Sequence, residues 1–237
     1  MTRKTAIIMG AMKAGTTTLH GILAQHPEIC GGWRKELNFF REDPTNMSDP
    51  YSDQFPQFDA SQHRFQLDSS PNYTKLPKMD GVPERIAEHA RQEPVQLIYI
   101  LRDPVARLRS HVYHNFRKGR WQPETLTKAQ IDFCINVSRY HMQLEAFAHA
   151  GLEDRILLVD FQRLITMPES VAVEIHAFLG LDPVPPKNTN ARHVNSKPKT
   201  EDHMIDLDRC RDALQDQGEL LKKHYDFVPQ TPWTYDP

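Results

Sequence analysis

The chain has 237 residues, of which 39% are hydrophobic and 25% are charged. Its 29 Lys and Arg residues against 31 Asp and Glu residues give a formal net charge of −2. This balance excludes the broad basic surface of a general nucleic-acid binder and the charge excess of a disordered tail. The length suits one domain with a sizeable core, so we predict a single domain over residues 1–237.

Short apolar runs predict buried strands at residues 5–9, 95–101 and 155–161, and a brief apolar segment lies at residues 65–68. Helical patterns cover residues 16–27, 83–91, 104–116, 129–150, 170–179 and 206–225. Asp103 is expected to cap the third of these helices and Gly180 to end the fifth. Residues 43–63 and 183–198 are expected to be irregular. The alternation of strands and helices predicts a three-layer α/β fold, with a central parallel sheet flanked by helices.

The three cysteines, Cys30, Cys134 and Cys210, are far apart and show neither disulfide-framework nor zinc spacing. They favour a reducing compartment. No apolar run approaches the roughly 20 residues of a membrane helix, and the apolar run near the N-terminus is too short for a secretory signal. We therefore expect a cytoplasmic protein with no membrane partner.

The segment TAIIM-GAMKAG-TTTL predicts a strand, a glycine-bearing turn and a helix start. Free backbone N–H groups and the positive end of the helix dipole make such a turn a cradle for phosphate or sulfate. Lys13 lies two residues before Gly15, whereas the Walker A loop places its lysine directly after the second glycine. This displacement argues against a triphosphate. It favours a nucleotide with a single 5′-phosphate to which another group is attached. The alternative is an ordinary turn with an exposed lysine.

GAMKAGTTTL resembles the 5′-phosphosulfate loop, GxxKxGTTxL, of sulfotransferases that use 3′-phosphoadenosine 5′-phosphosulfate (PAPS). The resemblance implies a P-loop nucleotide-kinase-like fold and PAPS as co-substrate, with no metal required. It also implies that Lys13 stabilises the charge that develops on the bridging oxygen. The residues implied to hold the 5′-phosphate are Lys13, Ala14, Gly15, Thr16, Thr17 and Thr18.

A second anchor is predicted where the strand VQLIYIL runs into RDPVARLRSHVYHN. An arginine at the carboxyl end of a parallel strand lies on the ligand side of the sheet. The segment resembles the RDPxxRxxSxY motif of the same family, which implies that Arg102 and Ser110 hold the 3′-phosphate. Arg107, His111 and His114 share a helix face with Ser110. Arg107 either faces the ligand or pairs with a nearby carboxylate.

Between the anchors stands WRKELNFF, in which Glu36 precedes Phe39 and Phe40. Apolar rings beside a carboxylate raise its pKa toward the range of a general base. The segment resembles the ExxFF motif of the heparan-sulfate branch and of similar bacterial enzymes, which implies that Glu36 is the general base. The alternatives are a salt-bridged surface Glu36, or a base among His20, His63, His111 and His114.

FQLDSSPNYT resembles the family segment that ends in [ST]-P-x-Y, but Ser69 stands where many heparan-sulfate relatives carry lysine. This departure argues against a polysaccharide and favours a small-molecule or natural-product acceptor. In the loop NARHVNSKPK, Lys197 and Lys199 are further candidates for the 3′-phosphate.

The sequence thus predicts transfer of a sulfuryl group from PAPS to an acceptor hydroxyl, with an amine as the weaker choice. Two other functions stay open at this point. One is a P-loop kinase that uses ATP and magnesium, in which Asp103 would hold the metal. The other is a non-catalytic module that binds adenosine 3′,5′-bisphosphate.

Overall fold

The computed structural model of the chain describes residues 3–43, 49–189 and 204–235. In these residues the strands form one parallel sheet in the order β2-β3-β1-β4-β5. The strands are β1 (Lys4–Gly10), β2 (Ile29–Gly31), β3 (Phe65–Asp68), β4 (Val95–Leu101) and β5 (Ile156–Asp160). β1 lies in the centre, so the loop after it opens at the middle of the sheet edge.

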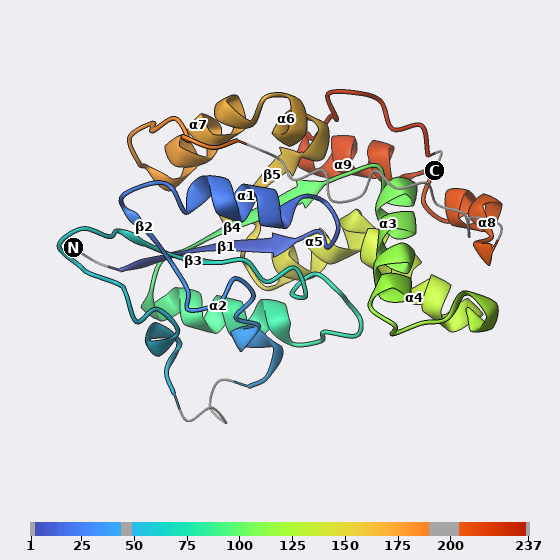
Figure 1. Ribbon diagram of the computed structural model, residues 1–237, viewed down its shortest axis with the longest axis horizontal. Coiled ribbons are helices and arrows are strands. Elements are labelled where there is room, and N and C mark those ends of the chain that lie inside the picture. Colours follow the sequence, from blue (N-terminus) through green and yellow to red (C-terminus); the bar gives the residue numbers. More distant parts are fainter. Residues whose placement is uncertain (1–2, 44–48, 190–203, 236–237) are drawn as a thin grey trace.

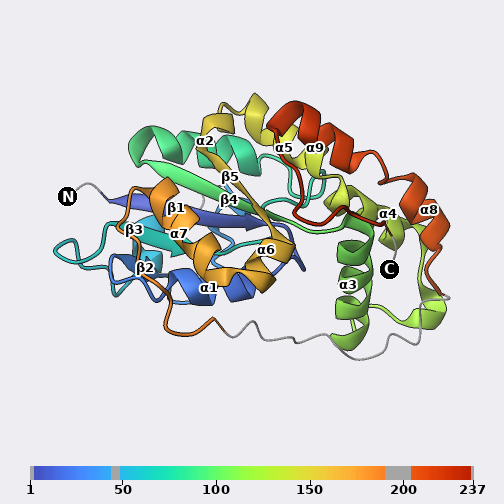
Figure 2. The same cartoon turned by 90° about the horizontal axis from the view of Figure 1, so that it is seen from above.

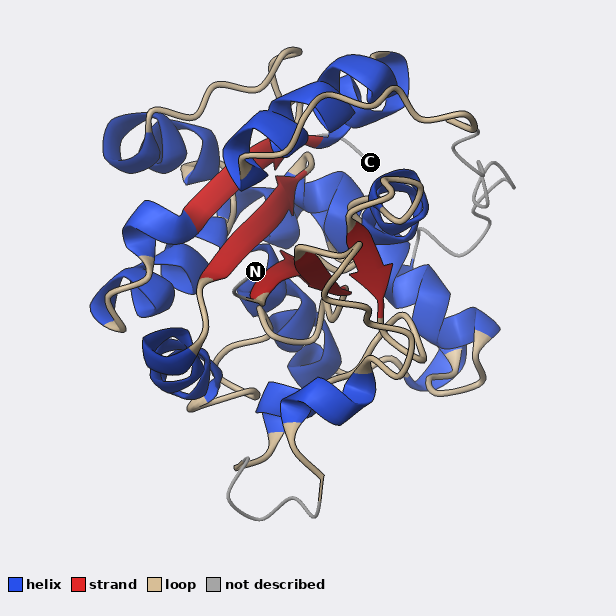
Figure 3. Cartoon of the chain, turned by 90° about the vertical axis from the view of Figure 1, so that its left-hand side faces the viewer, coloured by secondary structure: helices blue, strands red, loops and turns tan. Residues whose placement is uncertain are grey.

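Helices cover both faces of this sheet, as the alternation of elements predicts (Figures 1 and 3). One face carries α1 (Thr16–Leu23), α6 (Phe161–Thr166) and α7 (Pro168–Leu179). The opposite face carries α2 (Val82–Gln92) and α5 (Tyr140–His149), and α9 (Gln217–Tyr225) packs on α5 (Figure 2). The sheet is therefore the middle of three layers.

A second group of helices lies beyond the carboxyl ends of the strands (Figure 1). It consists of α3 (Pro104–Arg117), α4 (Lys128–Ser138) and α8 (Leu207–Asp212). Apolar side chains of these helices form a core of their own, separate from the core around the sheet. The inner face of α3 is consequently fixed against the edge of the sheet where the strands end.

Strand register places the functional segments together. β1 pairs with β3 so that Ile7 lies opposite Asp68, and with β4 so that Gly10 lies opposite Tyr99. The ends of β1, β3 and β4 therefore meet at one edge of the sheet. The segments that carry the glycine-bearing loop, the SSPNY turn and Arg102 all begin there.

The expected strands and fold class are confirmed, and Asp103 caps α3 through its side chain, which accepts from the backbone N–H groups of Val105 and Ala106. Gly180 ends α7 in the left-handed conformation with φ 67°.

The predictions of two long helices from periodicity were wrong. Residues 129–150 form α4 and α5, which break at Arg139, and Gln143 donates across the break to the carbonyl of Asn136. Residues 206–225 form α8 and α9, joined through turns at residues 213–216. In each pair the first helix packs in the core beyond the strand ends and the second packs in the core around the sheet.

The described residues include no helix with the length and apolar character needed to cross a membrane. The three cysteines are buried and free.

Candidate nucleotide and acceptor site

The loop between β1 and α1 leaves the first turn of α1 open to an anion. Gly15 is the N-cap with φ 89°, no side chain caps the helix, and its first turn holds no acidic residue. Thr16 is buried and Thr17 is exposed, so the turn presents both backbone and hydroxyl donors. Uncapped N–H groups at the positive end of a helix bind phosphate or sulfate well.

Two arginines hold this loop by its carbonyl oxygens. Nη1 of Arg102 donates to the carbonyl of Lys13 at 3.0 Å, and Nη1 of Arg107 donates to the carbonyl of Met12 at 3.2 Å. The Arg102 guanidinium also lies 4.7 Å from the centre of the Phe161 ring. Two N–H groups of the loop are also engaged, since Ala11 donates to the carbonyl of Ile100 and Ala14 to the carbonyl of Ala11. The uncapped start of α1 is therefore the part of the loop that is open to an anion.

Arg107 is fully buried, and its contacts differ from both sequence-based interpretations. Its Nε donates to Oγ of Ser138 at 2.7 Å, and its Nη2 donates to the carbonyl of Cys134 at 2.8 Å. Within residues 3–43, 49–189 and 204–235 the Arg107 guanidinium contacts no carboxylate, and it connects α4 to the loop. Arg107 therefore positions the loop from behind.

Positive charge gathers around Lys13. Burial lowers the pKa of Lys13 to about 8, with further lowering from Arg117, Arg102, Arg107 and Lys35. The charged groups with the largest effect on this pKa, among the residues described, are all cations. The loop is therefore a region of uncompensated positive potential, which an anionic ligand would relieve.

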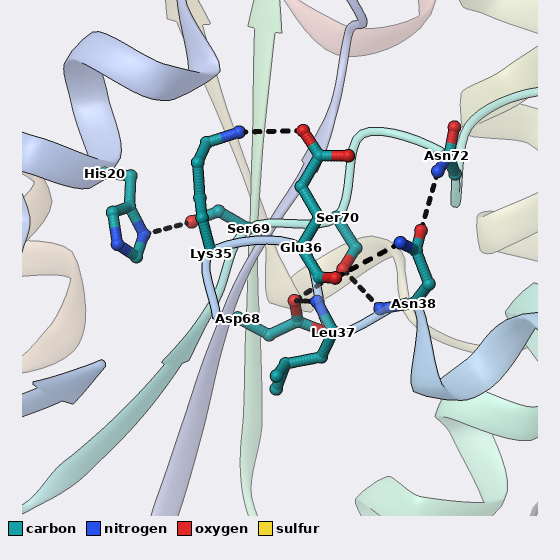
Figure 4. A network of polar contacts seen from close by, with 9 residues as sticks. All are labelled: His20, Lys35, Glu36, Leu37, Asn38, Asp68, Ser69, Ser70 and Asn72. Atoms are coloured by element: carbon teal, nitrogen blue, oxygen red, sulfur yellow. Dashed lines mark hydrogen bonds and ion pairs between the residues drawn. The ribbon is translucent and has the colours of Figure 1, made fainter. Parts of the chain in front are cut away.

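Glu36 lies in the loop between β2 and β3, next to this region (Figure 4). Its Oε1 lies 3.1 Å from Nζ of Lys35, and its side chain is 44% exposed. Lys35 is also one of the cations that lower the pKa of Lys13, so the carboxylate borders the same positive region. The rings of Phe39 and Phe40 are buried and pack against Tyr51.

The backbone that follows Glu36 is held by Asp68, a buried residue that sequence reasoning missed. Its Oδ1 accepts from Oγ of Ser70 at 2.5 Å and from the N–H of Leu37 at 3.4 Å, and its Oδ2 accepts from Tyr73 at 2.8 Å. Burial raises the pKa of Asp68 to about 6, although these hydrogen bonds act in the opposite direction. Asp68 thus joins the Glu36 loop to the SSPNY turn. The sequence signal that could have identified Asp68 is its position as the last residue of the apolar segment that forms β3.

Comparison with known proteins decides the family. The profile described as "Sulfotransferase domain" matches residues 3–205. The chain belongs to the sulfotransferase domain family. The expected family is thereby confirmed.

Among relatives, the chain is 26% identical over 199 residues to a bifunctional heparan sulfate N-deacetylase/N-sulfotransferase 4 of Mus musculus, covering 75% of this chain and 22% of that protein. It is 27% identical over 193 residues to a heparan sulfate glucosamine 3-O-sulfotransferase 5 of Mus musculus, covering 75% and 54%. The chain therefore spans between about a fifth and half of the length of these relatives. A sulfotransferase from Alicyclobacillus acidocaldarius shares the fold, with a TM-score of 0.73 and 21% identity over 94% of this chain and 96% of that one.

Within this sulfotransferase-family fold, Arg102 contacts the carbonyl of Lys13, and Glu36 pairs with Lys35. The roles of Lys13, Glu36 and Arg102 stay predictions. Ser110 is buried on the inner side of α3, three residues after Arg107, and its role toward a phosphate stays a prediction. Lys197 and Lys199 lie outside the described residues.

The alternative histidine bases differ in position. His63 precedes β3 and accepts from the N–H of Asp59, so it lies at the opposite end of the sheet from the loop. Burial lowers the pKa of His20 and of His114 to about 4, and it also lowers the pKa of His111 well below its usual value. His20 Nδ1 lies 2.7 Å from Oγ of Ser69, and that serine is fully buried.

Asp103 is occupied by backbone groups. Its Oδ1 caps α3, and its Oδ2 accepts from the N–H of Tyr235 at 2.9 Å. These contacts make it a structural cap and argue against the metal-binding aspartate that the kinase hypothesis requires.

A cavity of about 520 Å³ runs along α1 beside the loop. It is lined by Thr17, Thr18, Gly21, Ile22, Gln25, Asn188 and Thr189. Its place next to the open helix start gives the rest of a nucleotide room beyond the phosphate.

Proposed function

We propose that this chain transfers a sulfuryl group from PAPS to a hydroxyl group of a small-molecule or natural-product acceptor. The observation that carries the proposal is the positive potential around Lys13 at the uncapped start of α1. The family match supports sulfuryl transfer as the chemistry. The donor set consists of backbone N–H groups, hydroxyls and cations, which suits a ligand with two phosphates and a sulfate.

In this proposal the residues from Lys13 to Thr18 hold the 5′-phosphate of the donor. Arg102 and Ser110 hold the 3′-phosphate, with Lys197 and Lys199 as further candidates, and this second anchor selects the donor over ATP. Arg102 already lies against the loop through the carbonyl of Lys13, which brings the two anchors close. No step of the proposal uses a metal.

The reaction is an in-line displacement at sulfur. Glu36 takes the proton of the acceptor hydroxyl, whose oxygen forms the new bond to sulfur. The bond from sulfur to the bridging oxygen breaks, and its electron pair stays on that oxygen, where Lys13 stabilises the charge. An exposed ion pair is worth about 0–1 kcal/mol, so Lys35 does not prevent the Glu36 carboxylate from turning to an acceptor.

An amine acceptor is the second choice, and the names of the relatives include both N- and O-sulfotransferases. Ser69 at its present position continues to favour a small acceptor over a polysaccharide. Three free thiols agree with a reducing compartment, and we include a cytoplasmic location in the proposal.

The test of the base is Glu36→Gln, with Glu42→Gln as a control because Glu42 is an exposed glutamate of the same loop. Affinity for adenosine 3′,5′-bisphosphate is measured by calorimetry, and turnover by transfer of ³⁵S from labelled PAPS to a panel of small alcohols and phenols. We expect Glu36→Gln to bind the bisphosphate normally and to lose turnover by a factor of about 10² or more. The control keeps both.

Turnover retained in Glu36→Gln would reject Glu36 as the base. A wild-type protein that binds the bisphosphate but neither transfers sulfate nor releases it from PAPS would instead be the non-catalytic module.

A further inference from the structure

Lys75 is a buried cation that the proposed reaction has not used. The residue is 8% exposed and follows the SSPNY turn after β3. Among the residues that the structure describes, its ammonium group has no hydrogen-bond or ion-pair partner. A largely buried ammonium group without a partner costs free energy, and an anionic ligand would offset this cost.

The backbone on both sides of Lys75 is fixed. Oγ1 of Thr74 donates to the carbonyl of Met9 at 3.0 Å, at the end of β1. The N–H of Leu76 donates to Oε1 of Gln143 at 3.0 Å, and Nε2 of Gln143 donates back to the carbonyl of Leu76 at 3.2 Å. Lys75 is therefore held beside the start of the phosphate loop.

Charges near the loop and near the proposed base both act on Lys75. Burial is the main reason that its pKa is lowered to about 8, Arg107 lowers it further, and Glu36 acts in the opposite direction. Arg107 holds the loop carbonyl of Met12, and Glu36 is the proposed base.

Thr74 ties the Lys75 segment to the end of β1, where the phosphate loop begins. Tyr73 ties it through Asp68 to the loop that carries Glu36. The segment therefore borders both ends of the path from the 5′-phosphate to the acceptor.

We propose that Lys75 is a second cation for the sulfuryl group and donates hydrogen bonds to its oxygens while the group moves from the donor to the acceptor. Lys75 stays protonated throughout, and no bond to it forms or breaks. The inference rests on the proposed function. It also gives the SSPNY segment a cation, which Ser69 does not supply because its hydroxyl is neutral.

The test compares PAPS with adenosine 3′,5′-bisphosphate, which has the same two phosphates but no sulfuryl group. Dissociation constants of both are measured by calorimetry at pH 7 without acceptor, for wild type, Lys75→Met and Lys78→Met. Methionine keeps the length of the side chain and removes its charge. Lys78 is the control because it is exposed on the same segment, where its ammonium lies 5.3 Å from the centre of the Phe133 ring.

We expect Lys75→Met to weaken PAPS binding about tenfold, as is typical for loss of one charge-assisted hydrogen bond, and to change bisphosphate binding less than twofold. Lys78→Met should change neither. The thermal midpoint of ligand-free Lys75→Met should equal or exceed that of wild type, because the variant no longer buries an unpaired charge. Lys75→Gln serves the same comparison if the methionine variant does not fold.

Equal effects of Lys75→Met on PAPS and the bisphosphate, or no effect on either, would overturn the role of Lys75 and leave the proposed function standing. Failure of wild type to bind either nucleotide would reject the proposed function itself.

Discussion

The two sides of the site are held by buried charges of opposite sign. On the donor side, the guanidinium groups of Arg102 and Arg107 bind the carbonyls of Lys13 and Met12. On the acceptor side, the carboxylate of Asp68 binds two hydroxyl groups and a backbone N–H. The phosphate loop is thus fixed through two of its carbonyl groups, and the Glu36 loop through the N–H of Leu37.

This difference follows from what each loop presents. A loop that receives phosphate must keep the N–H groups at its helix start open to the ligand, so cations bind its carbonyls instead. A loop that carries a carboxylate base must keep that carboxylate accessible, and Glu36 is 44% exposed while Asp68 is fully buried. Two arginines therefore bind carbonyl groups of the phosphate loop. A buried carboxylate binds N–H and O–H groups around the loop that carries Glu36.

The largest effect is expected from removal of the acceptor-side support by Asp68→Ala. Ser70, Tyr73 and the N–H of Leu37 would lose their acceptor, and unsatisfied buried groups cost about 1–3 kcal/mol each. We expect the free energy of unfolding to fall by about 3–5 kcal/mol and turnover to fall with it. Urea unfolding measures the first, with Asp80→Ala as an exposed control. A loss below 1 kcal/mol would show that Asp68 does not hold the loop.

Arg107→Met should act on the other side. It leaves the carbonyls of Met12 and Cys134 without their donor, and hydrogen bonds to charged groups contribute about 1.5–3 kcal/mol. We expect bisphosphate affinity to fall at least tenfold, measured by calorimetry, while Arg91→Met, in an exposed ion pair of α2, leaves it unchanged. If Arg107→Met binds the bisphosphate as tightly as wild type, Arg107 does not position the loop.

A smaller effect is expected from pH. The pKa of Lys13 is lowered to about 8, so the free protein loses this ammonium as pH rises through 8, and bisphosphate affinity should fall by up to about tenfold per pH unit above that value. Calorimetry from pH 7 to 9.5 measures this dependence. In Lys13→Arg the charge persists, so the loss of affinity above pH 8 should be weaker; an equal loss in both proteins would exclude Lys13 as its source.

The same shift predicts the opposite trend in stability. Between pH 8 and the unfolded value of 10.5 the unfolded chain binds more protons at Lys13 than the folded chain does. The stability of the ligand-free protein therefore gains a contribution that increases with pH across this window. Thermal melts with and without bisphosphate should show the two trends side by side.

The sequence revealed the donor side more fully than the acceptor side. Lys13, Gly15 and the threonines that follow act through local backbone geometry, which a short motif encodes. Asp68 and Lys75 act through contacts with segments far away in the chain, such as the hydrogen bond of Asp68 to Leu37. Arg107 was visible in the motif, but its partners on α4 depend on a helix break at Arg139 that periodicity conceals.

The central claim is that two separate regions of positive charge bind the two phosphates of one adenosine. Calorimetric titration in the absence of metal, with adenosine 3′,5′-bisphosphate, 5′-AMP and 3′-AMP, tests it most directly. The account predicts that the bisphosphate binds at least about tenfold more tightly than either monophosphate, because each phosphate forms charge-assisted hydrogen bonds. A bisphosphate that binds no better than 5′-AMP, or binding seen only for ATP with magnesium, would contradict it.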